Sequence, residues 1–236
     1  GDVYKRQAKG LELPQGMRMS QVMENELPVH LHPGVCVLSG PNLAKEIIQG
    51  KISSTVVAGR NLDHCRAAQD ILMSNTFRVY TSDDMIGVEL GGALKNIIAL
   101  AAGIADGLQV GDNAKAALIT RGLAEITRLG VAAGAKPLTF AGLAGLGDLV
   151  ATCSSPLSRN HTVGRQLAQG RTWLDISRTM DNVAEGVNTT NAVLAMAKDL
   201  GVEMPIAQTT YQVLFEGLSP HCLLYTSPSP RDLSTS

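Results

Sequence analysis

Apolar residues in the first part of the chain come in short runs separated by turn-forming residues. Runs rich in β-branched and aromatic residues predict strands, because such side chains fit a pleated, half-buried surface. These runs lie at 35–38, 54–59 and 77–80. Residues 42–49 and 62–74 have helical spacing, with Asn42 placed to cap the first helix and Gly50 to end it. The alternation of strand and helix predicts the last part of an α/β sheet.

The pattern changes near residue 82, after which apolar positions follow a helical period. A helix capped by Asp83 or Asp84 is expected through residues 85–105, where Glu89 and Lys95 are the only charged side chains. Shorter helices are expected at 158–169, 173–180, 188–200 and 206–216. Glycines at 170, 201 and 217 stand where helix ends belong, and Pro205 begins the last helix. The fold class is therefore α/β followed by all-α.

A second long helix is expected at 114–133, capped by Asp112 or Asn113 and ended by Gly134. Its apolar stripe faces a core and could also support a homodimer. Its charged side chains are spaced to pair across turns on the polar face. They are Arg121, Glu125 and Arg128.

Composition narrows the function classes. The chain has 236 residues with a net charge of −1, without runs of Lys or Arg, and only 3% of the residues are aromatic. Nucleic acid is not an expected partner, because neither a basic surface nor stacking platforms are indicated. The apolar run at 97–105 is too short to span a bilayer, so no membrane insertion is expected. The four cysteines form no C-x-x-C motif, which favours a reduced, cytoplasmic protein without a metal site.

Both ends have unusual composition. Residues 1–7 and the Ser/Thr/Pro-rich residues 221–236 resemble translated adapter sequence. We expect both to be artefactual extensions, with a disordered tail at the carboxyl end.

Lys95 lies in the segment GGALKN at residues 91–96, within the most apolar helix. Gly91 and Gly92 lie one turn before it, so another part of the protein or a ligand can approach closely from that side. A partly desolvated lysine facing a cleft is a common setting for catalysis. The alternative is a lysine that extends its stem along the surface.

Two more segments carry candidate chemistry. In Gly145-Leu146-Gly147-Asp148, the glycines predict a tight turn followed by an acid, although such an acid is more often a helix cap. Ser158, Arg159 and Asn160 begin a predicted helix, and a helix start with an arginine suits a phosphate. Arg159 could equally be a solvated surface charge. Together with Lys95, these residues indicate a small phosphorylated ketone or alcohol as substrate.

These segments closely resemble the bacterial type of NAD(P)-dependent glycerol-3-phosphate dehydrogenase. Further matching segments are AKGLE at 8–12, SGPN at 39–42, NAKAALITRGLAE at 113–125, AGLGDLVATC at 144–153 and VEMP at 202–205. The resemblance implies a partial Rossmann domain at 8–82 and a helical catalytic domain, of the 6-phosphogluconate dehydrogenase type, at 83–220. It implies the interconversion of dihydroxyacetone phosphate and sn-glycerol 3-phosphate, for glycerophospholipid synthesis, with NAD or NADP.

Roles for single residues follow from the resemblance alone. Lys95 is implied to be catalytic, exchanging the proton at the C2 oxygen of the substrate. Substrate contacts are implied for Lys9, Gly40, Asn42, Lys95, Asn96, Asp148, Ser158, Arg159 and Asn160. Cofactor contacts are implied for Lys9, Ala44, Arg159, Val183 and Glu185.

The family's glycine-rich cofactor fingerprint does not occur in this sequence, since residues 142–147 have the wrong spacing. We therefore expect little or no turnover from this chain alone. Two rival interpretations remain open. One is another two-domain dehydrogenase, such as a relative of the 6-phosphogluconate or ketopantoate-reducing enzymes. The other is a non-catalytic helical interaction module.

Overall fold

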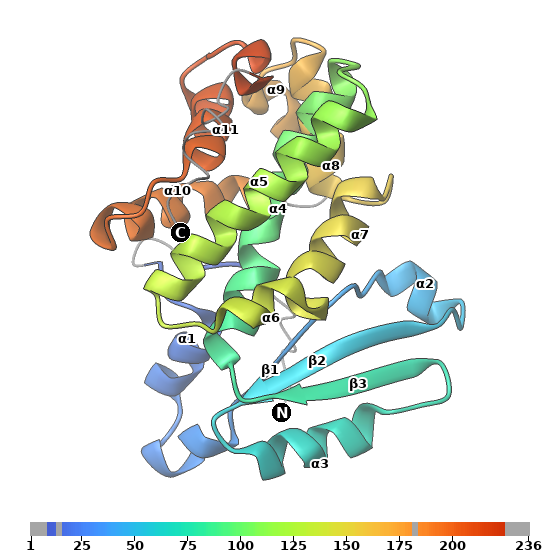
Figure 1. The fold of residues 1–236 in the computed structure, drawn as a ribbon, viewed down its shortest axis with the longest axis vertical. Coiled ribbons are helices and arrows are strands. Elements are labelled where there is room, and N and C mark those ends of the chain that lie inside the picture. Colours follow the sequence, from blue (N-terminus) through green and yellow to red (C-terminus); the bar gives the residue numbers. More distant parts are fainter. Residues whose placement is uncertain (1–8, 13–15, 181–183, 225–236) are drawn as a thin grey trace.

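A small sheet lies at one end of the molecule and a group of helices at the other (Figure 1). The computed structural model describes residues 9–12, 16–180 and 184–224. Strands end at Ser82, and the long helix α4 begins at Met85, close to the change of pattern in the sequence. The expected fold class, a Rossmann-like fragment followed by helices, is confirmed.

The sheet has three strands in the order β1-β2-β3. They are β1 (Cys36–Ser39), β2 (Ser53–Gly59) and β3 (Phe77–Ser82). β1 pairs antiparallel with β2, with Cys36 opposite Gly59, whereas β3 runs parallel to β2. All three predicted strands are present, each within two residues of its expected bounds.

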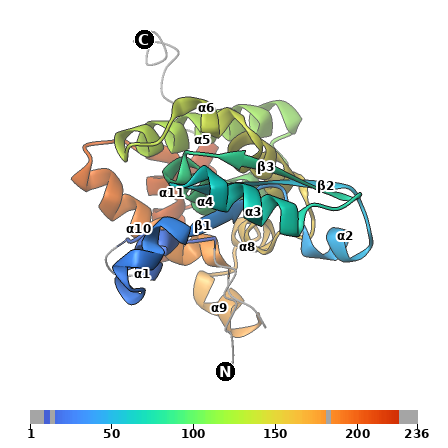
Figure 2. The ribbon, with the colours of Figure 1, turned by 90° about the horizontal axis from the view of Figure 1, so that it is seen from below.

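The strands have apolar side chains on both faces because both faces are covered. On one face, Val57 and Val79 pack with Cys65 of helix α3 (Leu62–Leu72). On the other face, Ala58 packs with the start of α4. This alternation along β2 follows from the two-residue period of a strand. Figure 2 shows the sheet between α3 and the helical part.

Three short helical elements surround the sheet. They are α1 (Met19–Glu26), the 3₁₀-helix η1 (Val29–Gly34) and α2 (Ala44–Ile48). The sequence pattern did not predict α1 or η1. The expected capping role of Asn42 is wrong, because Leu43 is the cap position of α2. The Asn42 side chain instead donates a 2.8 Å hydrogen bond to Thr55 Oγ1 on β2.

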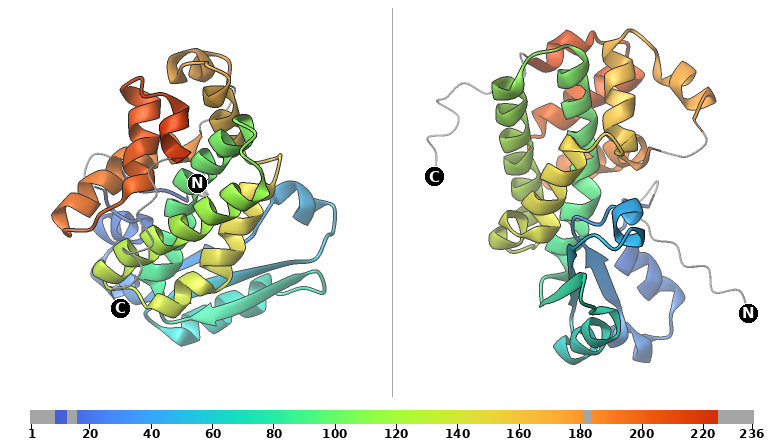
Figure 3. Two further views of the ribbon diagram at one scale, coloured as in Figure 1. Left: turned by 45° about the horizontal axis from the view of Figure 1, so that its top comes forward. Right: turned by 90° about the vertical axis from the view of Figure 1, so that its right-hand side faces the viewer.

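Helix α4 (Met85–Gly107) forms the centre of the helical part (Figure 3). Asp84 is its cap, as predicted, and accepts a 2.9 Å hydrogen bond from the Gly87 amide. The run at 97–105 was expected to be too short for a membrane span, but α4 as a whole is longer. By length and composition alone, α4 could cross a membrane. Of its most apolar window, 89% is buried within the protein, as in the core helix of a globular domain.

Further helical elements follow α4 in the part of the chain that the structure describes, and most of them pack on or near it. Their bounds are α5 (Asp112–Ala132), α6 (Pro137–Ala141), the π-turn η2 (Leu143–Gly147), α7 (Asp148–Ser154), α8 (Arg159–Ala168), α9 (Trp173–Arg178), α10 (Glu185–Asp199) and α11 (Pro205–Phe215). Gly170, Gly201 and Gly217 have positive φ angles just after helices end, which confirms them as terminators. Neither Asp112 nor Asn113 caps α5, because the helix already includes Asp112 and Gly111 is its cap position.

Helix α8 lies directly against α4. A Cβ atom at Gly103 would collide with the His161 carbonyl, and one at Gly164 would collide with the Leu100 carbonyl. Glycine at these positions therefore lets the two backbones touch. This contact fixes the beginning of α8 relative to Lys95 on α4.

Two expectations about the helical part are wrong. Glu125 is not on the polar face of α5 but only 2% exposed, and its carboxylate accepts hydrogen bonds from the Ile206 and Ala207 amides at 2.8 and 3.4 Å. Residues 221–224 are not part of a disordered tail, because they form the 3₁₀-helix η3 (Pro220–Leu224) and Leu223 is buried in the core. Residues 1–7 and 225–236 lie outside the described residues.

Candidate active site

Two lysines from distant parts of the chain share one aspartate at the junction of the sheet and the helices. Lys95 Nζ donates to Asp148 Oδ1 at 2.5 Å, and Lys9 Nζ donates to Asp148 Oδ2 at 2.7 Å. Lys9 Nζ also donates to the Gly40 carbonyl, at 2.9 Å. Asp148 and Lys95 are buried, with 2% and 6% exposure. One carboxylate thus positions two ammonium groups, one on each oxygen.

The glycines before Lys95 explain how this cluster can be so compact. A Cβ atom at Gly91 would lie 2.6 Å from the Ala144 carbonyl, so alanine would push η2 away. A Cβ atom at Gly92 would collide with Ser39 Oγ at the end of β1. The predicted close approach is therefore made by the protein itself, from η2 on one side and β1 on the other.

Asp148 is the first residue of α7, directly after the π-turn η2. The predicted tight turn at Gly145 and Gly147 is wrong, since these residues are in one wide helical turn that continues into α7. The capping alternative for Asp148 is also wrong, because the cap position of α7 is Gly147. The carboxylate of Asp148 points instead to the two lysines.

Thr152 belongs to the cluster, although the sequence analysis did not select it as a site residue. Its Oγ1 accepts a 2.7 Å hydrogen bond from Lys95 Nζ and donates a 2.6 Å bond to the Asp148 carbonyl. The signal was its spacing: residues four apart on a helix share a face. Lys95 is therefore held by a carboxylate and a hydroxyl from consecutive turns of α7.

The surroundings lower the pKa of Lys95 from its ordinary value of 10.5 to about 8. Burial is the largest cause and the positive charge of Lys9 is the second, while Asp148 acts in the opposite direction. A group with a pKa near the working pH can both donate and accept a proton. Lys95 is thus suited to general acid–base chemistry.

Asn96 and Glu185 extend the cluster toward α10. Asn96 Nδ2 lies 3.3 Å from the Lys9 carbonyl and 3.4 Å from Glu185 Oε2, and it donates to both. Burial raises the pKa of Glu185, although Lys95, Arg159 and Lys9 are near enough to oppose the shift. These contacts bring together Lys9, Asn96 and Glu185, which come from three separate segments of the chain.

The beginning of α8 adds the predicted anion-binding features. Ser158 is the cap of α8, and its Oγ accepts a 3.3 Å hydrogen bond from the His161 amide. Asn160 is buried, and its Oδ1 accepts a 3.0 Å bond from the Gly186 amide next to Glu185. Arg159 is exposed. Its guanidinium is therefore available to a ligand in front of the cluster.

The remaining predicted residues are less closely connected. Gly40 joins through its carbonyl, which holds Lys9. Asn42 is linked indirectly, through Thr55 Oγ1, which donates to the Ser39 carbonyl at 3.0 Å. Ala44 is an exposed residue at the start of α2. Val183 lies outside the described residues.

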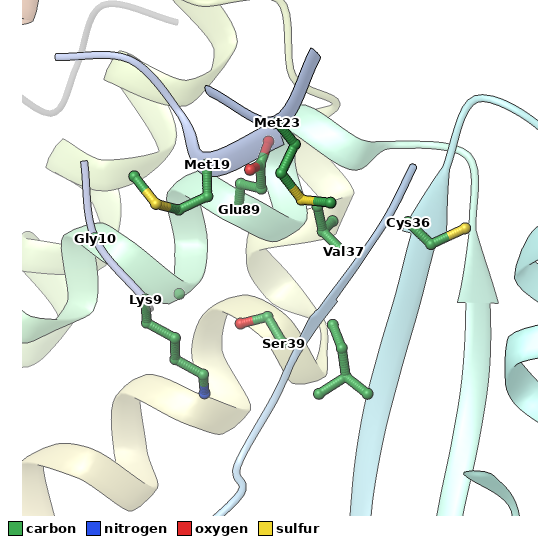
Figure 4. A pocket seen from close by; sticks show the side chains of 10 residues that line it. Lys9, Gly10, Met19, Met23, Cys36, Val37, Ser39 and Glu89 are labelled. Carbon is green, nitrogen blue, oxygen red and sulfur yellow. The ribbon is translucent and has the colours of Figure 1, made fainter. Parts of the chain in front are cut away.

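A cavity of about 310 Å³ opens beside Lys9. Figure 4 shows Lys9 and Ser39 on its wall together with two methionines, Met19 and Met23, from α1. Ser39 is 3% exposed, and its hydroxyl has no hydrogen-bond partner among the residues that the structure describes. Buried hydroxyls nearly always have a partner, so this one is available to a water molecule or a ligand.

Lys9 and Gly40, which precede and follow the start of the sheet in the chain, meet a lysine–aspartate pair on the helical part. This arrangement is the one expected for a two-domain dehydrogenase. Two family models match the chain and make the assignment specific. One describes the carboxyl-terminal part of NAD-dependent glycerol-3-phosphate dehydrogenase and matches residues 84–225. The other describes the amino-terminal part and matches residues 4–65. The chain belongs to the NAD-dependent glycerol-3-phosphate dehydrogenase family.

Curated relatives agree with this assignment. The chain is 56% identical over 213 residues to a glycerol-3-phosphate dehydrogenase [NAD(P)+] of Anaeromyxobacter dehalogenans, which covers 90% of this chain and 64% of the relative. It is 53% identical over 214 residues to the enzyme of the same name from Geobacillus thermodenitrificans, covering 90% of this chain and 62% of the relative. The chain thus spans just under two thirds of the length of the curated relatives it matches.

Solved structures show the same fold. The glycerol-3-phosphate dehydrogenase of Coxiella burnetii superimposes with a TM-score of 0.84 and 38% identity, over 96% of this chain and 67% of that one. The enzyme of Saccharomyces cerevisiae superimposes with a TM-score of 0.77 and 28% identity, over 88% of this chain and 62% of that one.

Proposed function

We propose that this chain carries the substrate site of an NAD(P)-dependent glycerol-3-phosphate dehydrogenase. The reaction interconverts dihydroxyacetone phosphate and sn-glycerol 3-phosphate, the backbone precursor of glycerophospholipids. The observation that supports it best is the buried Lys95 ammonium, held by Asp148 and Thr152 with a pKa of about 8. The helix start at Ser158 can bind the phosphate, and Arg159 in its first turn is near enough to Glu185 of the cluster to interact with it electrostatically.

Lys95 is proposed to move the proton of the reaction. During reduction its ammonium donates to the C2 oxygen as negative charge develops there, and during oxidation the neutral amine accepts the hydroxyl proton. Asp148 and Thr152 fix the Nζ atom through two hydrogen bonds, so the third N–H can face the substrate. Lys9 keeps the site positive, which favours a substrate phosphate and lowers the affinity of Lys95 for its proton.

The residues around the Lys9–Lys95 pair fit the nicotinamide end of a nicotinamide nucleotide. Lys9 and Ser39 line a cavity beside the lysine pair, and the Ser39 hydroxyl has no partner among the described residues. Glu185 is near enough to Lys95, Arg159 and Lys9 to interact with them electrostatically. When bound, the nicotinamide supplies or accepts the hydride at C2. Lys9, Ala44, Arg159, Val183 and Glu185 are the proposed cofactor contacts. Either NAD or NADP is compatible with them.

Arg159 offers a direct test of the substrate assignment. Arg159→Ala should weaken the binding of sn-glycerol 3-phosphate by about 2 kcal/mol, or roughly 30-fold, because a charge-assisted contact to the phosphate is lost. Titration calorimetry with the unmodified chain and the variant measures this difference. Arg165→Ala, which alters an exposed arginine later in the same helix, is the matched control and should bind normally.

Substrate competition separates the rival interpretations. A 6-phosphogluconate-type dehydrogenase would bind that acid in preference to sn-glycerol 3-phosphate. A non-catalytic module would bind sn-glycerol 3-phosphate weakly, and equally weakly in the unmodified chain and in Arg159→Ala. The proposal fails if either pattern is observed.

Turnover, location and assembly are further parts of the proposal. We propose that the chain alone oxidises NADPH with dihydroxyacetone phosphate slowly or not at all, since the sequence lacks the glycine-rich cofactor fingerprint. Lysine-dependent NADPH oxidation by the unmodified chain would contradict this. We also propose that the protein is cytoplasmic. It is further proposed to form a homodimer through the exposed side of α5, which sedimentation analysis tests.

A further inference from the structure

Cys36 and Cys65 lie in contact between the sheet and α3. Their Sγ atoms are 3.8 Å apart, although the residues are 29 positions apart in the chain. Cys65 is fully buried, whereas Cys36 is half-buried and lines the cavity beside Lys9. Figure 4 shows that the Cys36 sulfur points away from Lys9 and the two methionines, toward the side where Cys36 packs with Cys65. One thiol therefore belongs to a half-buried residue, and the other, fully buried, is in contact with it.

Gly59 provides the space in which the two sulfur atoms meet. It is opposite Cys36 in the strand register, and a Cβ atom there would lie 3.0 Å from both sulfur atoms. A disulfide requires a sulfur–sulfur distance of about 2.05 Å, so the atoms must approach by about 2 Å. The missing side chain of Gly59 leaves room for this movement.

The other thiols are not arranged in this way. Of the four cysteines, all within the described ranges, only Cys36 and Cys65 are in mutual contact. Cys153 is enclosed in the helical core, where burial raises its pKa to about 12. Cys222 is in η3, at the opposite end of the described chain.

We propose that Cys36 and Cys65 are a reversible dithiol–disulfide pair that reacts with small disulfides. The Cys36 thiolate attacks the external disulfide, and one thiol is released after taking up a proton. Cys65 then attacks Cys36 Sγ in the mixed disulfide, and its proton goes to the second departing thiolate. The protein dithiol is oxidised, the external disulfide is reduced to two thiols, and a reductant reverses both steps.

The order of the two steps follows from accessibility. Burial is the main cause that raises the pKa of Cys65, and the hydrogen bond with Cys36 adds to it, so Cys65 is a poor first nucleophile. In the mixed disulfide, however, Cys65 is next to the sulfur it attacks, and proximity compensates for low thiolate content. Cys36 is thus the attacking residue and Cys65 the resolving residue.

The Cys36–Cys65 disulfide would constrain β1, the strand that leads to the candidate active site. β1 begins at Cys36 and ends at Ser39, and the next residue, Gly40, accepts the hydrogen bond from Lys9. Joining Cys36 to α3 therefore ties the strand that presents this carbonyl to the helix behind the sheet.

Incubation of the native chain with 2-hydroxyethyl disulfide tests the proposal. After alkylation of the remaining thiols, intact mass and peptide mapping should show two alkylated cysteines instead of four and a cross-link between the peptides of Cys36 and Cys65. Dithiothreitol should restore all four thiols. Unchanged alkylation of four thiols, or a cross-link to Cys153 or Cys222, would overturn the proposal.

Two variants test the order of the steps. Cys65→Ala should accumulate a stable mixed disulfide at Cys36, because no resolving thiol remains. Cys36→Ala should leave Cys65 unreacted in the native protein. Equal reaction of Cys65 in that variant would refute the assignment. Circular dichroism verifies folding, and peptide mapping of the unmodified chain decides the cross-link even if a variant fails to fold.

Discussion

Lys95 and Glu125 are both buried in the helical part, and the protein compensates their charges in different ways. Lys95 is 6% exposed and is held by side chains, chiefly Asp148 and Thr152. Glu125 is 2% exposed and is held by backbone amides at the start of α11. Burial shifts both pKa values toward neutrality, that of Lys95 down to about 8 and that of Glu125 up to about 7.

The difference lies in what each group holds in place. The amides of Ile206 and Ala207 are free ends of a helix and need an acceptor, so Glu125 connects α5 to α11. Among the residues that the structure describes, no backbone amide of a helix end donates to Asp148 Oδ1 or Thr152 Oγ1, the two acceptors of Lys95. Similar burial and similar pKa shifts therefore serve structure at Glu125 and, in the function proposed above, proton transfer at Lys95.

Removing the Glu125 carboxylate should have the largest effect on stability. Glu125→Ala leaves two buried amides without acceptors and opens a cavity between α5 and α11, so the free energy of unfolding should fall by about 4 kcal/mol. Urea denaturation at pH 7 measures the change. Glu26→Ala, at an exposed glutamate that ends α1, is the control and should change the unfolding free energy by less than about 0.5 kcal/mol. A loss no larger than in this control would disprove the capping role.

The pH dependence of stability should show the second largest effect. Glu125 has a pKa of about 7 when folded and an ordinary value of 4.5. Between these values the folded state binds more protons, so its stability falls as pH rises from about 4.5 to 7, by about 3 kcal/mol. Glu125→Gln should remove this fall while keeping one acceptor for α11. Denaturation curves of both proteins between pH 4.5 and 7 give the unfolding free energy at each pH. If it falls equally steeply with pH in both proteins, Glu125 is not the cause of the fall.

The sequence predicted the Lys95 side of this comparison better than the Glu125 side. Gly91 and Gly92 before a lysine in an apolar helix are a local signal, and the resemblance named Asp148 and Lys9. Glu125 resembled an ordinary surface residue because its helical neighbours Arg121 and Arg128 offered plausible partners. Its actual partners, Ile206 and Ala207, are some eighty positions away, and only the packing of α11 on α5 brings them close.

The same reason explains the other differences between prediction and structure. The three strands and the helices α2 to α5 and α8 to α11 follow from local patterns and were predicted. The short elements α1, η1, α6, η2, α7 and η3 were not. The π-turn before Asp148 depends on how η2 packs against Gly91, and the contact of Cys36 with Cys65 depends on α3 covering the sheet. Such features are set by contacts between distant segments, which a single sequence does not reveal.

Replacing Lys95 should have a smaller effect on stability, and in the opposite direction to Glu125→Ala. Lys95→Met removes a desolvated ammonium from the core but leaves Asp148 paired with Lys9, so the unfolding free energy at pH 7 should rise by about 1 kcal/mol. The folded state of the unmodified chain binds fewer protons between pH 8 and 10.5, so its stability rises with pH in that window. The variant should lack this rise. A marked loss of stability in urea would mean that Lys95 holds the fold as Glu125 does.

The smallest expected effect concerns the charge of Lys9, which isolates one cause of the Lys95 shift. In Lys9→Met the repulsion between the two ammonium groups disappears and Asp148 pairs with Lys95 alone, so the pKa of Lys95 should move up toward its ordinary value. Carbon-13 methylation of the lysines followed by an NMR titration measures this pKa, with Lys95→Met assigning the signal. Lys51→Met, which alters an exposed lysine paired with Glu46, should leave the titration unchanged. If the pKa of Lys95 does not move in Lys9→Met, burial alone sets it, and Lys9 serves only to hold Asp148 and the Gly40 carbonyl.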